Sequence, residues 1–539
     1  MNEEIEDYYE ELYRLYVDEN QPLERRYRQL RESLERVVRE KIQGNSLQTT
    51  DLAARINYVA TQYGLDLKEQ NQLHTFRLTS NDILNHRKSP VKEEFLRDLR
   101  AVAYAYRKMF AQDIPLKLFS VLPKQEIASS GKKEKMEYIR RIRVCFDYAD
   151  DTYLYVHPVD VIADEPIRVV YNKPGINHEF EETIKELWRY AQLNLLDVSV
   201  DRDGIYTPSF IVLEPDYLID ISSLAECYKD YGSHPANYFL SRLVPIDNAR
   251  PLLLGNIANL FLDEWIHAGE EEPDYIDCMK KAFRQYPIEL AACAELRDPS
   301  KEKEFAKDCR MHFEHIRDVV QHTFLEPGYN LDKKEAVLEP SYICEALGIQ
   351  GRLDYMQRDM SSFIEMKSGK ADEFSMQGKV EPKENNKVQM LLYMAVLEYS
   401  MGQDRRRMHP YLLYTRYPLL YPARASWAQV RRVINLRNRI VAAEYGVQFH
   451  NHPDFTRNLL AQINPEVVNE RKLSGRFWEQ YLKPSISRFR EKLSALEPLE
   501  QAYFYTLYNF ITKELYTSKS GDVDYEGRAG ASALWLSTL

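Results

Sequence analysis

The sequence predicts an α+β protein built from several domains. The chain has 539 residues, enough for three or four domains at roughly 150 residues each. Along it, apolar residues change from helical spacing to short β-branched runs and then to a mixture of both. Hydrophobic residues make up 44% and charged residues 29%, an ordinary globular composition that does not favour disorder. We expect a helical segment at 1–112, a β-rich segment at 113–215, a mixed segment at 216–450 and a helical segment at 451–539.

Residues 1–112 carry apolar side chains at helical spacing. One stretch steps by three and four residues between charged positions: Leu23, Tyr27, Leu30, Leu34 and Val37. A second stretch has the same spacing: Phe95, Leu99, Val102, Tyr106 and Phe110. Such spacing places the apolar residues on one helix face. The two stretches could pack as a helical hairpin, and a packing role is favoured here over a catalytic one.

Residues 113–215 read as short strands, namely RIRVCFDY, TYLYVHPV, IRVVY and SFIVLEP, separated by Pro, Gly and Asp. They predict a small β domain, with a barrel as one arrangement. One helix, EETIKELWRYAQLNLL, is expected between its strands. Helices follow at ANYFLSRL and LLLGNIANLFLDEWIH, then strands near 335–367, a helix at 387–399, the strand HPYLLYTRY and the helix SWAQVRRVINLRNRIVAAEY. Residues after about 450 are expected to be helical with aromatic-rich faces.

Bulk properties exclude several classes of protein. The net charge of −11 argues against coating nucleic acid along the whole surface, although it allows a local groove. The N-terminus MNEEIEDYYEELY is acidic and lacks a signal sequence, and no apolar run approaches the roughly 20 residues of a membrane span. We therefore expect a cytoplasmic protein without a membrane partner. The six cysteines form no C-x-x-C pair, so they predict small buried residues in a reducing compartment.

The segment GRLDYMQRDMSSFIEMKSGK carries the clearest chemistry. It reads as two strands joined by a short polar turn, and side chains two apart on a strand share a face. Glu365 and Lys367 therefore point the same way, and Asp354 on the neighbouring strand can reach the same point. Two carboxylates are hard ligands for Mg²⁺ or Mn²⁺, and an ammonium can hold an attacking water or offset charge on phosphate. The pattern predicts phosphodiester hydrolysis; the alternative is a surface hairpin with a solvated Glu365 and Lys367.

Gln389 and Tyr393 lie four residues apart and share a helix face, from which they could contact a DNA backbone. In order, G-x-x-D at Gly351, E-x-K-S-G-K at Glu365 and Q-x-x-x-Y at Gln389 resemble the motifs of RecB-like PD-(D/E)XK nucleases. The chain looks in particular like the nuclease half of the replication and repair nuclease-helicases, with the CRISPR adaptation exonucleases as cousins. The resemblance covers about 205–445 in order.

This resemblance implies a central restriction-endonuclease-like core, preceded by an OB-type barrel. It implies that Asp354 and Glu365 bind Mg²⁺ or Mn²⁺, that Lys367 serves the nucleophile or transition state, and that Gln389 and Tyr393 position the strand. The expected activity is that of a metal-dependent deoxyribonuclease acting on single-stranded or flapped DNA in replication, repair or defence.

The sequence departs from the family pattern in three places. The family's metal-binding histidine is replaced by Asn259, a weaker ligand, although Asp263 lies one turn further on and could share the site. Cys227 matches the first cysteine of the family's iron–sulfur cluster, but no cysteine follows Cys344, so no cluster is expected. The phosphate loop G-x-x-x-x-G-K-[ST] is absent from this sequence, so no ATP hydrolysis is expected.

A path for DNA is expected between Asp404 and Ile440, where nine arginines and one acid are interleaved with aromatic residues. The alternative is a solvated helix face with the tyrosines in the core. The predicted DNA-binding residues are Lys370, Arg416, Arg431, Arg432 and Arg437.

Two other functions stay open. The chain could be a catalytically silent DNA-binding scaffold that kept the fold. It could also be the nuclease portion of a nuclease-helicase, with the motor in a longer chain or a partner subunit.

Overall fold

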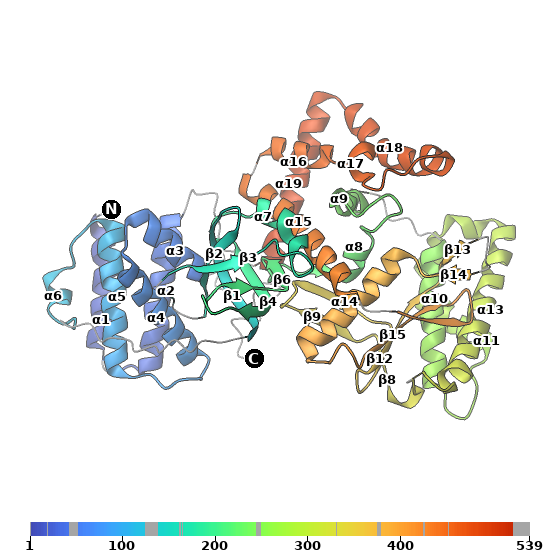
Figure 1. Cartoon of the computed structure of the whole chain (residues 1–539), viewed down its shortest axis with the longest axis horizontal. Helices are drawn as coiled ribbons and strands as arrows, with labels where there is room; N and C mark the ends of the chain where they lie inside the picture. The colour runs from blue at the N-terminus through green and yellow to red at the C-terminus, as the bar shows by residue number, and fades with distance from the viewer. Residues whose placement is uncertain are drawn as a thin grey trace. The chain divides into compact units, whose positions relative to one another are not determined.

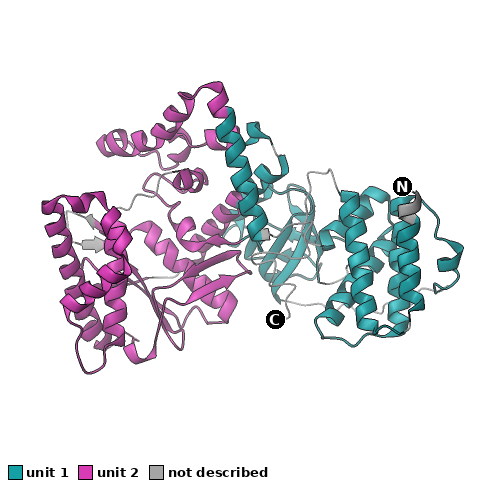
Figure 2. Cartoon of the chain, turned by 180° about the vertical axis from the view of Figure 1, so that it is seen from behind, with its two compact units in different colours: residues 1–217, 441–456, 502–539 teal, residues 218–440, 457–501 magenta. Residues whose placement is uncertain are grey.

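The computed structural model describes residues 2–18, 20–42, 52–123, 138–160, 163, 165–243, 250–329, 331–374, 379–423, 426–450 and 452–520. These residues form a mixed α+β protein, as the sequence predicts (Figure 1). The chain divides into two compact units (Figure 2). Unit 1 comprises 1–217, 441–456 and 502–539, and unit 2 comprises 218–440 and 457–501. In the described part of the chain, no helix is both long and apolar enough to cross a membrane.

Unit 1 begins with packed helices. They are α1 (Asn2–Val17), α2 (Leu23–Ile42), α3 (Leu52–Tyr63), α4 (Leu67–Leu84), α5 (Lys92–Phe110) and the short α6 (Leu116–Phe119). The two predicted amphipathic stretches are α2 and α5, and their apolar faces enter one buried core with α1, α3 and α4. Tyr27 of α2 donates a hydrogen bond to Asp98 of α5 at 3.2 Å. The predicted hairpin is therefore part of a larger helical bundle.

The β-rich part of unit 1 is a six-stranded sheet of order β1-β2-β3-β5-β4-β6. Its strands are β1 (Tyr138–Ala149), β2 (Tyr153–Pro158), β3 (Ile167–Val170), β4 (Gln192–Val200), β5 (Tyr206–Thr207) and β6 (Phe210–Leu213). An additional antiparallel pairing of β1 with β4 closes the sheet upon itself. Closure satisfies the backbone groups of strands that would otherwise lie at an edge.

The predicted helix EETIKELWRYAQLNLL is wrong in its second half. Only η1 (His178–Phe180) and α7 (Glu181–Lys185) are helical, and the chain then enters β4. Tyr190 has a left-handed φ of 73° that a continuing helix could not contain. Residues 192–196 are all buried and pair with β1 and β6, so tertiary packing outweighs the local helical pattern.

Unit 2 is built around a five-stranded sheet of order β16-β15-β12-β11-β8. These strands are β8 (Ala336–Leu338), β11 (Tyr355–Gln357), β12 (Ser362–Lys367), β15 (His409–Tyr414) and β16 (Leu419–Pro422). Strand β12 runs parallel to β15 and antiparallel to β11. A three-stranded sheet joins β7 (Ile219–Asp220), β10 (Ile349–Arg352) and β9 (Ser341–Cys344), and β13 (Asp372–Phe374) pairs with β14 (Lys379–Glu381).

Helices cover both faces of the five-stranded sheet. Ile364 and Met366 of β12 join a buried core with α10 (Arg250–His267) and α13 (Pro299–Gln321), which contact each other. The alternate residue Glu365 faces α14 (Glu384–Met401), whose Gln389 hydrogen-bonds to it. Strand alternation thus places Ile364 and Met366 on one face of the sheet and Glu365 and Lys367 on the other.

The remaining helices of unit 2 are shorter. They include α8 (Ile221–Ala225), α9 (Ala236–Leu243), α11 (Tyr275–Gln285), α12 (Pro287–Ala292), η2 (Ala294–Arg297), η3 (Thr323–Leu325), η4 (Lys333–Glu335), α17 (Pro465–Val468), the π-helix η5 (Trp478–Leu482) and α18 (Lys483–Ser494). The chain crosses from unit 2 to unit 1 within α15 (Trp427–His450) and returns within α16 (Pro453–Ala461). A last crossing to unit 1 falls within α19 (Pro498–Ser520). The predicted helical segment 451–539 is therefore shared between the two units.

Candidate active site

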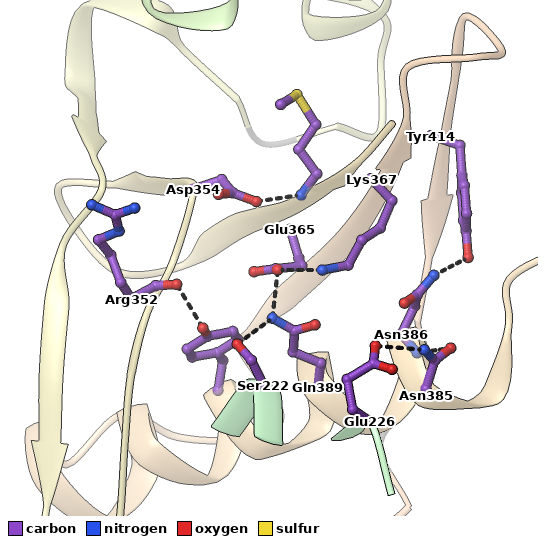
Figure 3. A network of polar contacts seen from close by, with 12 residues as sticks. Ser222, Glu226, Arg352, Asp354, Glu365, Lys367, Asn385, Asn386, Gln389 and Tyr414 are labelled. Carbon is purple, nitrogen blue, oxygen red and sulfur yellow. Dashed lines mark hydrogen bonds and ion pairs between the residues drawn. The ribbon is translucent and has the colours of Figure 1, made fainter. Parts of the chain in front are cut away.

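Glu365 is the centre of a buried polar network on β12 (Figure 3). Glu365 is only 3% exposed. Its Oε1 accepts hydrogen bonds from Lys367 Nζ at 2.8 Å and from Gln389 Nε2 at 2.6 Å. Its other oxygen, Oε2, has no hydrogen-bond partner in the described part of the chain. One oxygen of this carboxylate is therefore oriented by the protein while the other remains able to accept a ligand.

Asp354 lies opposite Glu365 because of the strand register. Tyr355 pairs with Ile364 in the antiparallel ladder, so the next step outward brings Asp354 level with Glu365. Asp354 sits between β10 and β11, half-buried, and its Oδ2 accepts a hydrogen bond from the Met366 N–H at 2.7 Å. The expectation that these two carboxylates and Lys367 come together is confirmed by this geometry.

The charges of this cluster influence one another strongly. Burial raises the pKa of Glu365 to about 8, and the charge of Asp354 adds to the rise while Lys367 opposes it. Burial also raises the pKa of Asp354. For Lys367, burial works to lower the pKa, but the ion pair with Glu365 and the charge of Asp354 prevail and raise it. The site therefore disfavours two ionised carboxylates unless a cation joins them.

Gln389 and Tyr393 of α14 contact the groups that surround Glu365 and Asp354. Gln389 is buried and bonds Glu365, with a longer contact of 3.5 Å to Ser222 of α8. Tyr393 is also buried, and its hydroxyl donates to the Arg352 carbonyl at 2.6 Å. Both side chains are about as buried as Glu365 itself, so contact with a DNA backbone stays a prediction. In this structure they hold Glu365 and the backbone that leads into Asp354.

Gly351 is a glycine for a steric reason. A β-carbon at this position would lie 3.0 Å from Tyr393 Cε1 and 3.0 Å from Ile221 Cδ1. These separations are tighter than ordinary van der Waals contact, so a side chain would displace Tyr393 or β10. The glycine at the start of the G-x-x-D motif thus permits α14 to approach the strand that carries Asp354.

One face of α10 runs along the site. Gly255, Asn259 and Asp263 follow one another at intervals of four residues and share that face. A β-carbon on Gly255 would lie 3.3 Å from Ser368 Oγ, just beyond Lys367. At the other end, burial raises the pKa of Asp263 to about 6, and the charges of Glu339 and Asp354 contribute. Asn259 therefore lies midway, half-buried, on a helix face that passes from Ser368 toward Asp354.

Glu339 is a residue of the site that sequence reasoning missed. Leu338 pairs with Tyr355, so Glu339 lies opposite Asp354, and its N–H donates to the Asp354 carbonyl at 3.1 Å. Its carboxylate forms an ion pair with Arg352 at 3.1 Å. In the sequence it is one acid among many, with no motif spacing to mark it. Only the pairing of β8 with β11 brings it to Asp354.

The predicted DNA-binding residues divide into buried and accessible groups. Arg437 has 0% exposure, and its Nε donates to the Gly348 carbonyl at 3.2 Å. Arg431 is also buried. Both predictions are corrected, because a side chain enclosed by protein cannot contact DNA at the surface. Lys370 and Arg432 are exposed and Arg416 is half-buried, so these three stay accessible.

Two of the four tyrosines between these arginines belong to the core, and Tyr417 and Tyr421 are half-buried. Tyr411 and Tyr414 of β15 are buried, and the Tyr414 hydroxyl accepts a hydrogen bond from the Lys383 N–H at 3.0 Å. For Tyr411 and Tyr414 this outcome matches the alternative in which the tyrosines pack inside. An aromatic and basic sequence pattern therefore does not by itself identify a surface.

The donor atoms of the site suit a hard divalent cation. Among the described residues, no three His, Cys, Asp or Glu side chains form a ready metal-binding group. Mg²⁺, however, commonly binds one or two carboxylates and completes its coordination with water and phosphate oxygens. The unpartnered Oε2 of Glu365 and the adjacent carboxylate of Asp354 are donors of that kind. All six cysteines are buried and free, and none contributes to this cluster.

No protein-family model matches the sequence. No curated protein matches it either. What the site does must therefore follow from its residues and their geometry.

Proposed function

We propose that the chain is a metal-dependent nuclease that hydrolyses phosphodiester bonds of DNA, with a RecB-like PD-(D/E)XK core. The observation that carries this proposal is the carboxylate of Glu365, which is buried, held at one oxygen and unpartnered at the other. Burying such a group opposite Asp354 costs free energy, and groups with strongly raised pKa values gather at functional sites. A bound cation would offset that cost.

The arrangement of elements supports the same proposal. In unit 2, β12 runs parallel to β15 and antiparallel to β11, with α10 and α13 on one face and α14 on the other. This order agrees with the restriction-endonuclease-like core that the sequence motifs imply. The closed sheet of unit 1 agrees with an OB-type barrel.

Each side chain then has a chemical task. Mg²⁺ or Mn²⁺ bound by Asp354 and Glu365 would polarise a phosphate and lower the pKa of a water molecule. Lys367 holds its ammonium 2.8 Å from Glu365, where it can orient the attacking water or offset charge that develops on phosphate. Gln389 fixes the orientation of Glu365, and Tyr393 fixes the backbone before Asp354.

The test is cleavage of labelled single-stranded and flapped DNA with Mg²⁺, with Mn²⁺ and with a chelator. Asp354→Asn and Glu365→Gln are each expected to lower the rate by roughly a hundredfold or more, because either change removes a ligand charge. Glu289→Gln, at an exposed position on α12, is the matched control and should cleave normally. Full activity in either site variant, or cleavage in chelator, would contradict the proposal.

A silent DNA-binding scaffold is the second candidate, favoured by Asn259 in the slot where the resembled family has histidine. It predicts DNA binding without cleavage under every metal condition. The same cleavage experiment separates the two, since a scaffold would leave the DNA intact with Mg²⁺ and with Mn²⁺.

A further inference from the structure

Residues 471–492 form a strongly basic segment in an acidic protein. This segment, which we call the basic aromatic segment, has seven lysines and arginines and two glutamates, whereas the whole chain has a net charge of −11. It includes η5 and the first part of α18. All of its basic residues are exposed: Arg471, Lys472, Arg476, Lys483, Arg488, Arg490 and Lys492. Positive charge is therefore concentrated in one short stretch of the chain, within which Lys483 also forms an ion pair with Glu479 at 2.9 Å.

The basic aromatic segment is anchored beside the candidate active site within unit 2. Trp478 is buried and meets Tyr231 edge to face, with ring centroids 5.7 Å apart. Arg471 forms an ion pair of 2.5 Å with Glu384 in the first turn of α14. Glu384 precedes Gln389 on the same helix by five residues, or about 7.5 Å along the helix axis at the standard rise. The first residue of the segment is thus held at the start of the helix that carries Gln389.

Two large aromatic side chains of the segment point to solvent. Phe477 is 55% exposed and Tyr481 is 64% exposed, and their ring centroids lie 5.8 Å apart with planes inclined by 33°. Trp478, at the start of the π-helical turn 478–482, is buried while these two rings are exposed. Such turns are uncommon and occur frequently at functional sites. Exposed rings among exposed cations suit a ligand that has both flat faces and negative charge.

We propose that the basic aromatic segment binds single-stranded nucleic acid, with Phe477 and Tyr481 stacking on bases and the surrounding lysines and arginines contacting phosphates. Stacking requires bases that are not enclosed in a duplex, so the segment discriminates for single strands. An apolar protein partner would not need seven basic residues, and an acidic protein would not need two open rings. The further step, that the segment guides the strand to Glu365, rests on the proposed nuclease function; the binding itself does not.

The basic aromatic segment offers nucleic acid an alternative to the predicted path along α15. Arg431 and Arg437 are enclosed in the protein, so the predicted path along α15 loses two of its cations. The basic aromatic segment supplies exposed cations and exposed rings together. Exposed aromatics also occur on α19, at Tyr503 and Phe510, but that helix carries two lysines and two glutamates and has no net positive charge.

The experiment measures binding of a fluorescein-labelled thymidine oligonucleotide of about 20 nucleotides by anisotropy, in chelator so that no cleavage occurs. Phe477→Ala with Tyr481→Ala should raise the Kd about tenfold or more and leave the salt dependence unchanged, because stacking carries no counterion release. Arg488→Glu with Arg490→Glu should raise the Kd and flatten the salt dependence, by roughly 0.7 in slope for each lost phosphate contact. The control, Tyr503→Ala with Phe510→Ala, should bind within about twofold of the unmodified chain.

Each outcome decides something. An unchanged Kd in the Phe477 and Tyr481 variant overturns the stacking surface, and an equal loss of duplex binding overturns its preference for single strands. If the unmodified chain cleaves DNA while this variant binds normally, the proposed binding surface is wrong and the nuclease proposal is unaffected. If the chain binds through this segment but never cleaves, the nuclease function fails and the surface stands. Circular dichroism and Tm confirm folding, which these exposed substitutions should preserve.

Discussion

At the residue scale, the two oxygens of Glu365 have different roles because their surroundings differ. Oε1 is held by Lys367 and Gln389, whereas Oε2 is buried without a partner among the described residues. Strand alternation in the sequence correctly predicts that Glu365 and Lys367 share a face. It does not reveal the environment that raises the pKa of Glu365 to about 8, because that depends on burial and on Asp354.

Cation binding should depend on pH in a definite direction. Glu365 is protonated below a pKa of about 8, so a cation must displace its proton there. Mn²⁺ affinity is expected to rise about tenfold per pH unit between pH 6 and 8 and to level off above 8. Calorimetric titration of Mn²⁺ without DNA measures this, and Glu365→Gln should bind weakly at every pH. A pH-independent Kd in the unmodified chain would contradict it.

The same shift affects stability without a metal. The folded protein binds this proton more tightly than the unfolded chain does, because a solvated glutamate has an ordinary pKa of 4.5. The stabilising contribution is therefore fully present below pH 4.5 and is lost as pH rises through about 8. Mn²⁺ should consequently raise Tm more at pH 8 than at pH 6.

Arg437 should govern stability rather than DNA affinity. Its guanidinium is enclosed and donates to the Gly348 carbonyl, and it fills the space that a β-carbon on Gly348 would need. Arg437→Ala is expected to lower the free energy of unfolding by roughly 2–4 kcal/mol, because buried polar groups lose their partner. Arg432→Ala, at an exposed position of the same helix, should change it by less than about 0.5 kcal/mol. Urea denaturation measures the free energy of unfolding of both variants. Equal values for Arg437→Ala and Arg432→Ala would contradict the enclosed position of Arg437.

At the element scale, the apolar pattern correctly predicts the helix α10 but wrongly predicts a helix where β4 forms. The apolar spacing of LLLGNIANLFLDEWIH predicts α10, which is confirmed over Arg250–His267. Residues 192–196 also fit a helix by pattern, yet they form β4. Ladders with β1 and β6 bury that segment on both sides, and this long-range pairing outweighs its local preference.

The metal concentration needed for cleavage should change when Asn259 or Asp263 of α10 is substituted. Asn259→Ala should raise the metal concentration needed for half-maximal cleavage by less than tenfold, since its amide brings no charge, while Asp263→Asn should raise it by about 10- to 100-fold. Asn259→His should shift preference toward Mn²⁺, which accepts imidazole more readily than Mg²⁺. Cleavage against metal concentration measures all three. Identical curves would place α10 outside the reach of the cation.

At the scale of the whole molecule, neither compact unit is formed by one continuous stretch of the chain. The chain leaves unit 2 within α15, returns within α16 and leaves again within α19, so each unit is assembled from distant segments. The predicted domain limits near 112, 215 and 450 follow changes in composition. The actual grouping depends on which segments bury surface together, which composition does not encode.

Whole-protein assays should detect neither iron nor ATP hydrolysis. The sequence has no phosphate loop, and no cysteine follows Cys344, so an iron–sulfur cluster with the layout of the resembled family is not expected. Metal analysis is expected to find iron far below one atom per chain, and ATP hydrolysis should stay at background with or without single-stranded DNA. Stoichiometric iron or DNA-stimulated ATP hydrolysis by this chain would contradict the expectation.

The sequence by itself determined the mixed α+β class, the helices with strong periodicity and the association of Asp354, Glu365 and Lys367. These follow from local rules, since strand alternation and a short turn act over a few residues. Tertiary structure alone decided that Glu339 joins Asp354, that Arg437 is enclosed, and that Phe477 and Tyr481 are exposed together. Burial and distance between remote segments depend on how the whole chain packs, and no local pattern carries that information.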